Sequence, residues 1–124
     1  MGIELSWLNE RVLLMRFEGK WTWDDFYVVT KQAEDLTRQK PFVVCVIADL
    51  MRSDSPPAHG FVNLRNALST QPPNSGPTYL IGSSRFIEAL LAIFAKVYPA
   101  LAKFLVPATS YKHALEMIGE LETD

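Results

Sequence analysis

Several features that would point to a particular function are missing from this sequence. It has one cysteine, Cys45, which cannot form an internal disulfide and lies in an apolar run, where a thiol behaves as a small hydrophobe. Its only histidines, His59 and His113, are not spaced as metal ligands. We therefore expect no disulfide, no metal and no cofactor, and the cysteine usage fits a reducing cytoplasm.

The sequence also lacks clusters of like charge and long apolar runs. Lys and Arg form no cluster along the chain, and the net charge is −2, so nothing indicates a nucleic-acid partner or a basic membrane-binding patch. No stretch reaches the roughly 18 apolar residues that a membrane-spanning helix needs. Glu4 and Glu10 interrupt the region where a signal peptide would be basic and then apolar. We expect a cytoplasmic protein.

What is present fits one globular domain over residues 1–124, with 48% hydrophobic and 21% charged residues. Alternating apolar side chains in residues 3–7 and 12–17 predict an antiparallel hairpin with its turn at Asn9 and Glu10. Thr22, followed by two aspartates, predicts the start of a helix that ends near residues 40–41.

The next run, Phe42 to Leu50, is apolar without alternation until Asp49, which is typical of a parallel strand covered on both faces. The remaining elements are predicted from the helical or strand spacing of apolar residues and from the Gly and Pro residues that interrupt it. They are a helix over 61–68, a loop over 71–77, a strand over 78–81, a helix over 85–103 that Pro99 ends or bends, an edge strand over 104–106 next to Pro107, and a helix from Ser110.

The order is therefore ββαβαβαβα. It predicts an α/β fold with a mixed, mostly parallel sheet of about five strands, an N-terminal β-hairpin and about four helices. This order resembles the STAS-domain family, which includes anti-sigma-factor antagonists and sulfate-transporter tails. The strand ending in Asp49 and Leu50, the glycine at Gly60, and the closing strand and helix around Ser110 and Ala114 carry the resemblance. A broader set of STAS-like single-domain bacterial proteins, sometimes grouped with lipid carriers, is similar as well.

The resemblance implies a non-enzymatic regulatory domain that binds other proteins. The family's Asp-Ser-x-Gly signature, however, places its Asp on Pro57 and its phosphorylated Ser on Ala58, and keeps only Gly60. Alanine has no hydroxyl to accept phosphate. The phosphorylation switch therefore does not carry over, unless Ser53 or Ser55 substitutes after a shift of the loop.

The loop after the buried strand is the first candidate site, because ligands gather at the carboxyl ends of strands in α/β sheets. We predict a partner- or ligand-binding site here, formed by Asp49, Arg52, Asp54, Ala58, His59 and Gly60. One alternative to a binding site is an enzyme that uses Asp49, His59 and Arg52 in catalysis. The simpler one is that Asp49 caps a turn and His59 is merely exposed, and we expect no catalytic residues.

A second candidate site lies where a strand leads into the long helix. Ser83, Ser84 and Arg85 place two hydroxyls, free backbone amides and a guanidinium at a helix start, which suits a phosphate or sulfate. The same residue types also make an ordinary helix N-cap. Both interpretations remain open at this point.

The helix over 85–103 is apolar around more of its circumference than a surface helix usually buries. One stripe contains Phe86, Leu90, Ile93, Val97 and Leu101, and a second contains Ile87, Leu91, Phe94 and Tyr98. We predict an apolar interface or pocket at Phe86, Leu90, Leu91, Phe94 and Tyr98. Alternatively, the last helix or the loop over 71–77 covers the extra width. Because Trp21 and Trp23 flank the first helix cap, we also expect one of them to lie at the surface.

Two functions are consistent with these patterns. The first is a STAS-like protein-interaction domain that binds another protein or itself, as a homodimer, without a phosphate switch. The alternative is a carrier of a small apolar, lipid-like ligand in a pocket between the sheet and the helix over 85–103.

Overall fold

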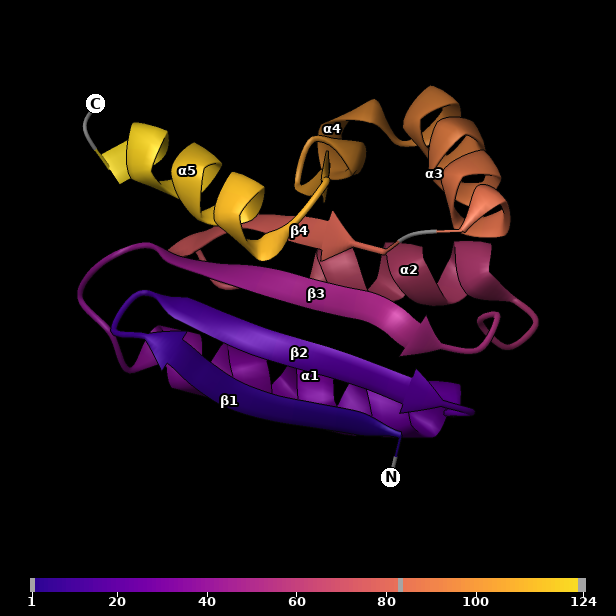
Figure 1. Ribbon diagram of the computed structural model, residues 1–124, viewed down its shortest axis with the longest axis horizontal. Helices are drawn as coiled ribbons and strands as arrows, with labels where there is room; N and C mark the ends of the chain where they lie inside the picture. The colour runs from indigo at the N-terminus through magenta and orange to yellow at the C-terminus, as the bar shows by residue number, and fades with distance from the viewer. Residues whose placement is uncertain (1, 83, 123–124) are drawn as a thin grey trace.

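The computed structural model describes residues 2–82 and 84–122 as one α/β unit built on a five-stranded sheet (Figure 1). The strands are β1 (Ile3–Asn9), β2 (Val12–Gly19), β3 (Val44–Ser53), β4 (Ser75–Ile81) and β5 (Leu105–Ala108). The helices are α1 (Trp23–Arg38), α2 (Gly60–Ser69), α3 (Arg85–Val97), α4 (Pro99–Ala102) and α5 (Tyr111–Glu122). No helix among these residues is both long and apolar enough to cross a bilayer.

The strand order in the sheet is β1-β2-β3-β4-β5, so β3 is central, as its uninterrupted apolar run predicts. Only β1 and β2 are antiparallel, with Ile3 opposite Phe17. The pairs β2–β3, β3–β4 and β4–β5 are all parallel. The carboxyl ends of four strands therefore meet at one edge of the sheet, and the mixed, mostly parallel sheet is confirmed.

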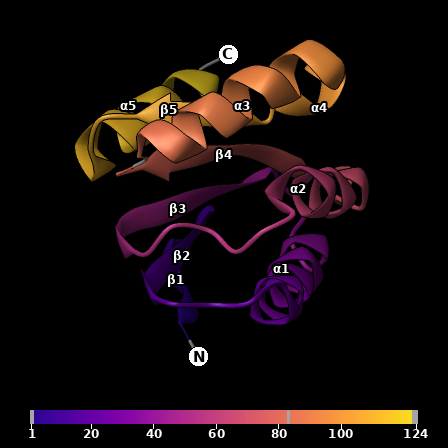
Figure 2. The same cartoon turned by 90° about the vertical axis from the view of Figure 1, so that its right-hand side faces the viewer.

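Two apolar cores lie on opposite faces of the sheet. Figure 2 shows α1 and α2 on one face and α5 on the other, with α3 and α4 along the margin next to β4. The larger core joins alternate residues of β1 to β4 to α1 and to Ile87 of α3. The smaller core joins the intervening strand residues to Ala114 and Ile118 of α5. The two-residue alternation along each strand thus divides the side chains between the two cores.

Helix α1 begins where the sequence predicts it. The Thr22 hydroxyl accepts a hydrogen bond from the Asp25 N–H at 3.1 Å, and the Asp25 carboxylate accepts one from the Thr22 N–H at 3.1 Å. This reciprocal capping box satisfies two of the amides that a helix start leaves unpaired.

The structure corrects several predicted boundaries. The single helix predicted over 85–103 is two helices, because Tyr98 leaves the helical conformation (φ −127°, ψ 64°) ahead of Pro99, so there are five helices instead of about four. The hairpin turn lies at Glu10 and Arg11 instead of at Asn9, because the Asn9 side chain accepts from the Arg11 N–H at 2.8 Å.

Several strands also differ from their predicted bounds. Strand β5 spans Leu105–Ala108 instead of 104–106, so Pro107 lies within it, opposite Leu80. Strand β4 begins at Ser75 instead of Thr78, so the preceding loop is shorter than predicted. Strand β3 extends to Ser53, three residues past Leu50, and the Asp54 N–H then donates to the Gly19 carbonyl at 3.0 Å. This extension matters for function because it moves the start of the β3–α2 loop to Asp54.

Candidate functional site

Four connections emerge from the carboxyl-end edge of the sheet: β2–α1, β3–α2, β4–α3 and β5–α5. This is the edge at which ligands of parallel α/β sheets generally bind. The β3–α2 connection, residues 54–59, carries Asp54, Ala58 and His59 of the six residues predicted for the first site and is called the β3–α2 loop below.

Asp49 does not face this loop. It is opposite Arg16 in the strand register, is only 7% exposed, and lies on the face of the sheet that α5 covers. The Tyr111 hydroxyl of α5 donates a hydrogen bond to one carboxylate oxygen, and the Met51 N–H donates to the other at 3.0 Å. Both oxygens are therefore engaged, and Asp49 ties α5 to the sheet.

The same contact perturbs the tyrosine. Burial, the hydrogen bond to Asp49 and the charge of Asp49 raise the pKa of the Tyr111 hydroxyl to about 12, against a smaller opposing effect of Arg16. The protonated hydroxyl is the form that can donate to the carboxylate. The Tyr111 hydroxyl is therefore a fixed hydrogen-bond donor with a structural role. It is not a group that transfers protons near neutral pH.

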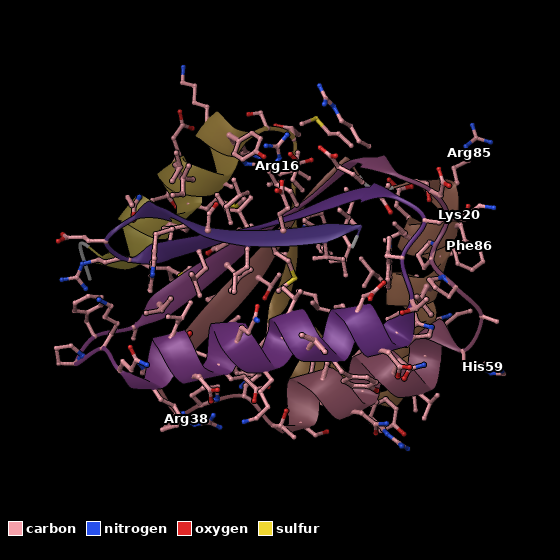
Figure 3. All side chains as sticks on the ribbon, turned by 90° about the horizontal axis from the view of Figure 1, so that it is seen from below. Arg16, Lys20, Arg38, His59, Arg85 and Phe86 are labelled. Atoms are coloured by element: carbon pink, nitrogen blue, oxygen red, sulfur yellow. The ribbon has the colours of Figure 1, made fainter. Side chains whose placement is uncertain are left out.

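The β3–α2 loop ends in an unusual backbone conformation. His59 has φ +70°, the left-handed region that non-glycine residues seldom adopt, and it precedes Gly60, the first residue of α2. Its side chain caps nothing and projects away from the body of the molecule (Figure 3). A Cβ on Gly60 would lie 3.1 Å from the Leu90 Cδ2, so glycine permits the close approach of α2 to α3.

The side chains of two tryptophans hold this loop in place by hydrogen bonds. The Trp23 indole N–H donates to the Ala58 carbonyl at 2.6 Å, and the Trp21 indole N–H donates to the Ser53 hydroxyl at 2.9 Å. The two indole rings pack edge to face with their centroids 5.0 Å apart. Trp21 is buried and Trp23 is half-buried, so Trp23 is the one of the two that lies partly at the surface.

The predicted acidic and basic residues do not assemble into a catalytic set. Within the described chain, no hydrogen bond or ion pair joins Asp49 to Arg52, Asp54 or His59; Arg52 instead lies 3.9 Å from Glu18. Likewise, no group of three His, Cys, Asp or Glu side chains in residues 2–82 and 84–122 could hold a metal ion. An open cleft of about 740 Å³ beside the loop is lined by Lys20, Trp21, Thr22, Asp25, Asp54, Ser55 and Pro57.

The predicted anion site is described only in part. Ser84 is the N-cap of α3, and its hydroxyl accepts from the Ile87 N–H at 3.3 Å. Arg85 is exposed, and Ser83 lies outside the described residues. The hydroxyl of Ser84 thus has the capping role that the simpler interpretation assigns to it.

The two apolar stripes of α3 have different environments. Phe94 is fully buried, with its ring centroid 5.5 Å from that of Phe61 on α2 and 5.4 Å from that of Tyr98. Leu91 and Tyr98 are half-buried beside it. Of the five residues predicted as an apolar interface, Phe94 therefore belongs to the core, Leu90 is half-buried, and Phe86 is exposed.

Between the sheet and the helices α1, α2 and α3 lies an apolar cavity of about 140 Å³. It extends from Trp21 and Trp23 at the carboxyl-end edge to Gln71 and Ser75 at the other end of the sheet. Its walls include small side chains on a helix or strand, namely Ala33, Ala48 and Ala67. Apolar cavities of about 150 Å³ stay dry and accept molecules the size of benzene.

Sequence reasoning predicted an apolar pocket between the sheet and the helix over 85–103, and Leu90 and Leu91 of that prediction line the cavity, but it missed the walls that α1 and α2 contribute and the contact of Tyr111 with Asp49. The signal for the cavity was the set of alanines at core-facing positions, which leave space that Leu or Ile would fill. Tyr111 and Asp49 are 62 residues apart, so no local pattern connects them.

The fold is similar to those of two solved proteins. One is the anti-sigma factor antagonist SpoIIAA in its unphosphorylated form, with a TM-score of 0.70 and 13% identity over 95% of this chain and 96% of that chain. The other is an uncharacterized DUF3478-family protein with a SpoIIAA-like fold from Shewanella loihica PV-4, with a TM-score of 0.63 and 15% identity over 93% and 90%. No protein-family model and no curated protein matches the sequence. At these identities the likeness shows the fold alone: the chain has an α/β fold of the SpoIIAA-like kind.

Proposed function

We propose that this chain is a non-enzymatic, STAS-type regulatory domain that binds a protein partner through the β3–α2 loop. The observation that carries the proposal is the loop itself, which is exposed yet fixed. Asp54 and His59 present their side chains to solvent, while the backbone between them is anchored by the Trp23–Ala58 hydrogen bond. A fixed, exposed loop binds with little loss of conformational entropy.

The proposal includes the absence of a phosphate switch. Ala58, at the position where the STAS signature has its serine, carries no hydroxyl. Of the nearby serines, Ser53 already accepts from Trp21 and donates to the Asp54 carbonyl at 2.7 Å, which leaves Ser55 as the exposed hydroxyl of the loop. The expected behaviour is binding that does not depend on phosphorylation.

The test is partner capture from an extract of the source cells, with the wild-type chain as bait and a loop variant beside it. Asp54→Ala with His59→Gly removes both exposed side chains, and glycine keeps the left-handed backbone at position 59 without strain. A protein that binds through the loop is captured by the wild type and lost with this double variant.

The matched control is Val28→Ser, an exposed position on α1, which should retain the partner. If every captured protein is retained equally by the double variant, the loop is not the binding site. Size-exclusion chromatography with light scattering on the same proteins tests the narrower proposal that the partner is a second copy, in a homodimer. A monomeric mass at all concentrations would exclude the second copy.

A second candidate function follows from the 140 Å³ cavity: binding of a small apolar ligand between the sheet and α1, α2 and α3. Native mass spectrometry after mild purification should then show added mass that Ala67→Leu removes, because the larger side chain occupies the cavity. A chain that carries no added mass and gains no thermal stability from small apolar probes would contradict this function. We further propose that the domain is bacterial and cytoplasmic, in keeping with its single buried cysteine.

A further inference from the structure

We propose that the outer face of α3 lies on the surface of an anionic lipid bilayer. This inference goes beyond the protein-binding role of the β3–α2 loop and rests on a different surface. The surface, called the α3 stripe below, consists of Phe86, Ala89, Ile93 and Val97.

The three large side chains of the α3 stripe are unusually exposed. Phe86, Ile93 and Val97 are 56%, 56% and 55% exposed, although each would bury well in a core. Their spacing of seven and four residues places them within about 40° of one another around the helix. They form a continuous apolar ridge about 17 Å long, and no part of the described chain covers it.

The side of the helix next to the α3 stripe, where Ile87 and Phe94 lie roughly 80–100° around from Phe86, is already occupied. Ile87 and Phe94 are buried, and Ile87, Leu90 and Leu91 line the apolar cavity. The α3 stripe is therefore not a displaced part of the core. Figure 2 shows α3 along the margin of the molecule, beyond β4, and the large side chains of the α3 stripe are exposed there. An apolar stripe with basic residues beside it is typical of a helix that lies in the plane of a bilayer surface.

The charges beside the α3 stripe indicate which kind of surface it binds. Arg85 and Lys96 are eleven residues apart and thus lie on the same flank of the helix, roughly 80–100° from the stripe. Both are exposed, and neither forms an ion pair with an acid in the described part of the chain. Glu88, the one acidic residue of α3, lies roughly 160° from Phe86, away from the stripe.

This arrangement of cations disfavours a second copy as the occupant. An antiparallel pair of α3 helices that packs Phe86 against Val97 would bring Arg85 of one copy beside Lys96 of the other, and like charges at an interface are unfavourable. The same two cations are attracted to an anionic lipid surface, where each contributes about a fivefold gain in affinity. Figure 3 shows Arg85 and Phe86 projecting at the same end of the molecule.

The experiment is flotation of the purified full chain with two kinds of vesicle, phosphatidylcholine alone and phosphatidylcholine mixed with phosphatidylglycerol. The wild type is expected to float with the mixed vesicles and much less with the neutral ones. Ile93→Ser or Val97→Ser should each weaken this binding by about tenfold, because an apolar side chain no longer enters the bilayer. Lys96→Gln should weaken it by about fivefold, and only with the anionic vesicles.

Val28→Ser is the matched control for Val97→Ser, because Val28 is also a half-exposed valine (49%) but lies on α1. It should float like the wild type, as should the loop variant Asp54→Ala with His59→Gly, so the two proposals fail independently. The proposal is overturned if the wild type does not float with anionic vesicles, or if Val28→Ser and Val97→Ser lose the same affinity. The proposal is also overturned if the wild type is an oligomer in the absence of vesicles and Val97→Ser lowers its mass. That result would indicate that the α3 stripe is an interface between copies of this chain.

Discussion

The two faces of the sheet differ in how completely they are filled. On the face covered by α5, a small core is closed by one buried polar contact between Asp49 and Tyr111. On the face covered by α1, α2 and α3, the core is larger, yet it encloses a cavity of about 140 Å³ and leaves an apolar ridge at its outer margin.

This difference indicates where function lies. On the α5 face, both carboxylate oxygens of Asp49 accept hydrogen bonds that hold the helix to the sheet. The helix-rich face carries the cavity, the β3–α2 loop and the α3 stripe. The strand-end aspartate, which the sequence offers as the first candidate for chemistry, therefore belongs to the structural side of the molecule.

The sharpest contrast within the helix-rich face is between Phe94 and Phe86. Phe94→Ala should lower the free energy of unfolding by about 3–5 kcal/mol, because it leaves a hole between α2 and α3. Phe86→Ala should change it by less than about 1 kcal/mol, since the ring is already in solvent. Urea denaturation of the two variants measures both values. Equal losses would mean that the stripe and the core are not distinct.

On the α5 face, Asp49→Ala should lower the free energy of unfolding by about 2–3 kcal/mol. It removes the acceptor of both the Tyr111 hydroxyl and the Met51 amide and leaves these donors unpaired in a buried site. Denaturant unfolding measures the loss, and partner capture and vesicle flotation should be unchanged. A stable Asp49→Ala chain that loses its partner would instead place Asp49 in the binding site.

The same contact should be visible in the pH dependence of stability. Folding raises the pKa of Tyr111 from 10.0 to about 12, so the folded state keeps a proton that the unfolded state has released. The free energy of unfolding should therefore be unaffected below pH 10 and fall by about 2 kcal/mol as the pH rises to 12.

Because burial also raises the pKa of Tyr79, the relevant quantity is the difference between the wild type and Tyr111→Phe. In that variant the alkaline decrease should be smaller by about 2 kcal/mol. Parallel stability curves for the two proteins above pH 10 would show that Asp49 does not hold the Tyr111 proton.

The smallest effect on stability is expected for a substitution that fills part of the cavity. Ala67→Leu places about three additional carbons in the cavity, so the free energy of unfolding should stay within about 1 kcal/mol of the wild type. Thermal unfolding followed by circular dichroism measures the change. A loss of about 3 kcal/mol or more would indicate overpacking and hence no usable space at this site.

Much of the fold can be predicted from local patterns in this sequence. The alternation in the hairpin, the continuous apolar run of β3 and the Thr22 cap each specify one element without reference to the rest of the chain. The turn position was wrong because a single side-chain contact from Asn9 shifts it by one residue. The break in the long helix was predicted at the right residue, Pro99.

The site depends on packing between distant elements and was less predictable. Both stripes of α3 look equivalent in sequence, and only the docking of Phe61 and Gly60 of α2 against one of them decides which is buried. The basic flank escaped notice for a similar reason, because Arg85 and Lys96 come to lie on the same side of the helix only once it is formed.

The central claim is a protein-binding domain without a phosphate switch, and one measurement tests it directly. The wild-type chain is incubated in source-cell extract with ATP and Mg²⁺, and its intact mass and its affinity for the captured partner are measured before and after. We expect no phosphoryl group on the chain and an unchanged affinity. A phosphoryl group on Ser53 or Ser55, together with loss of the partner, would contradict the account.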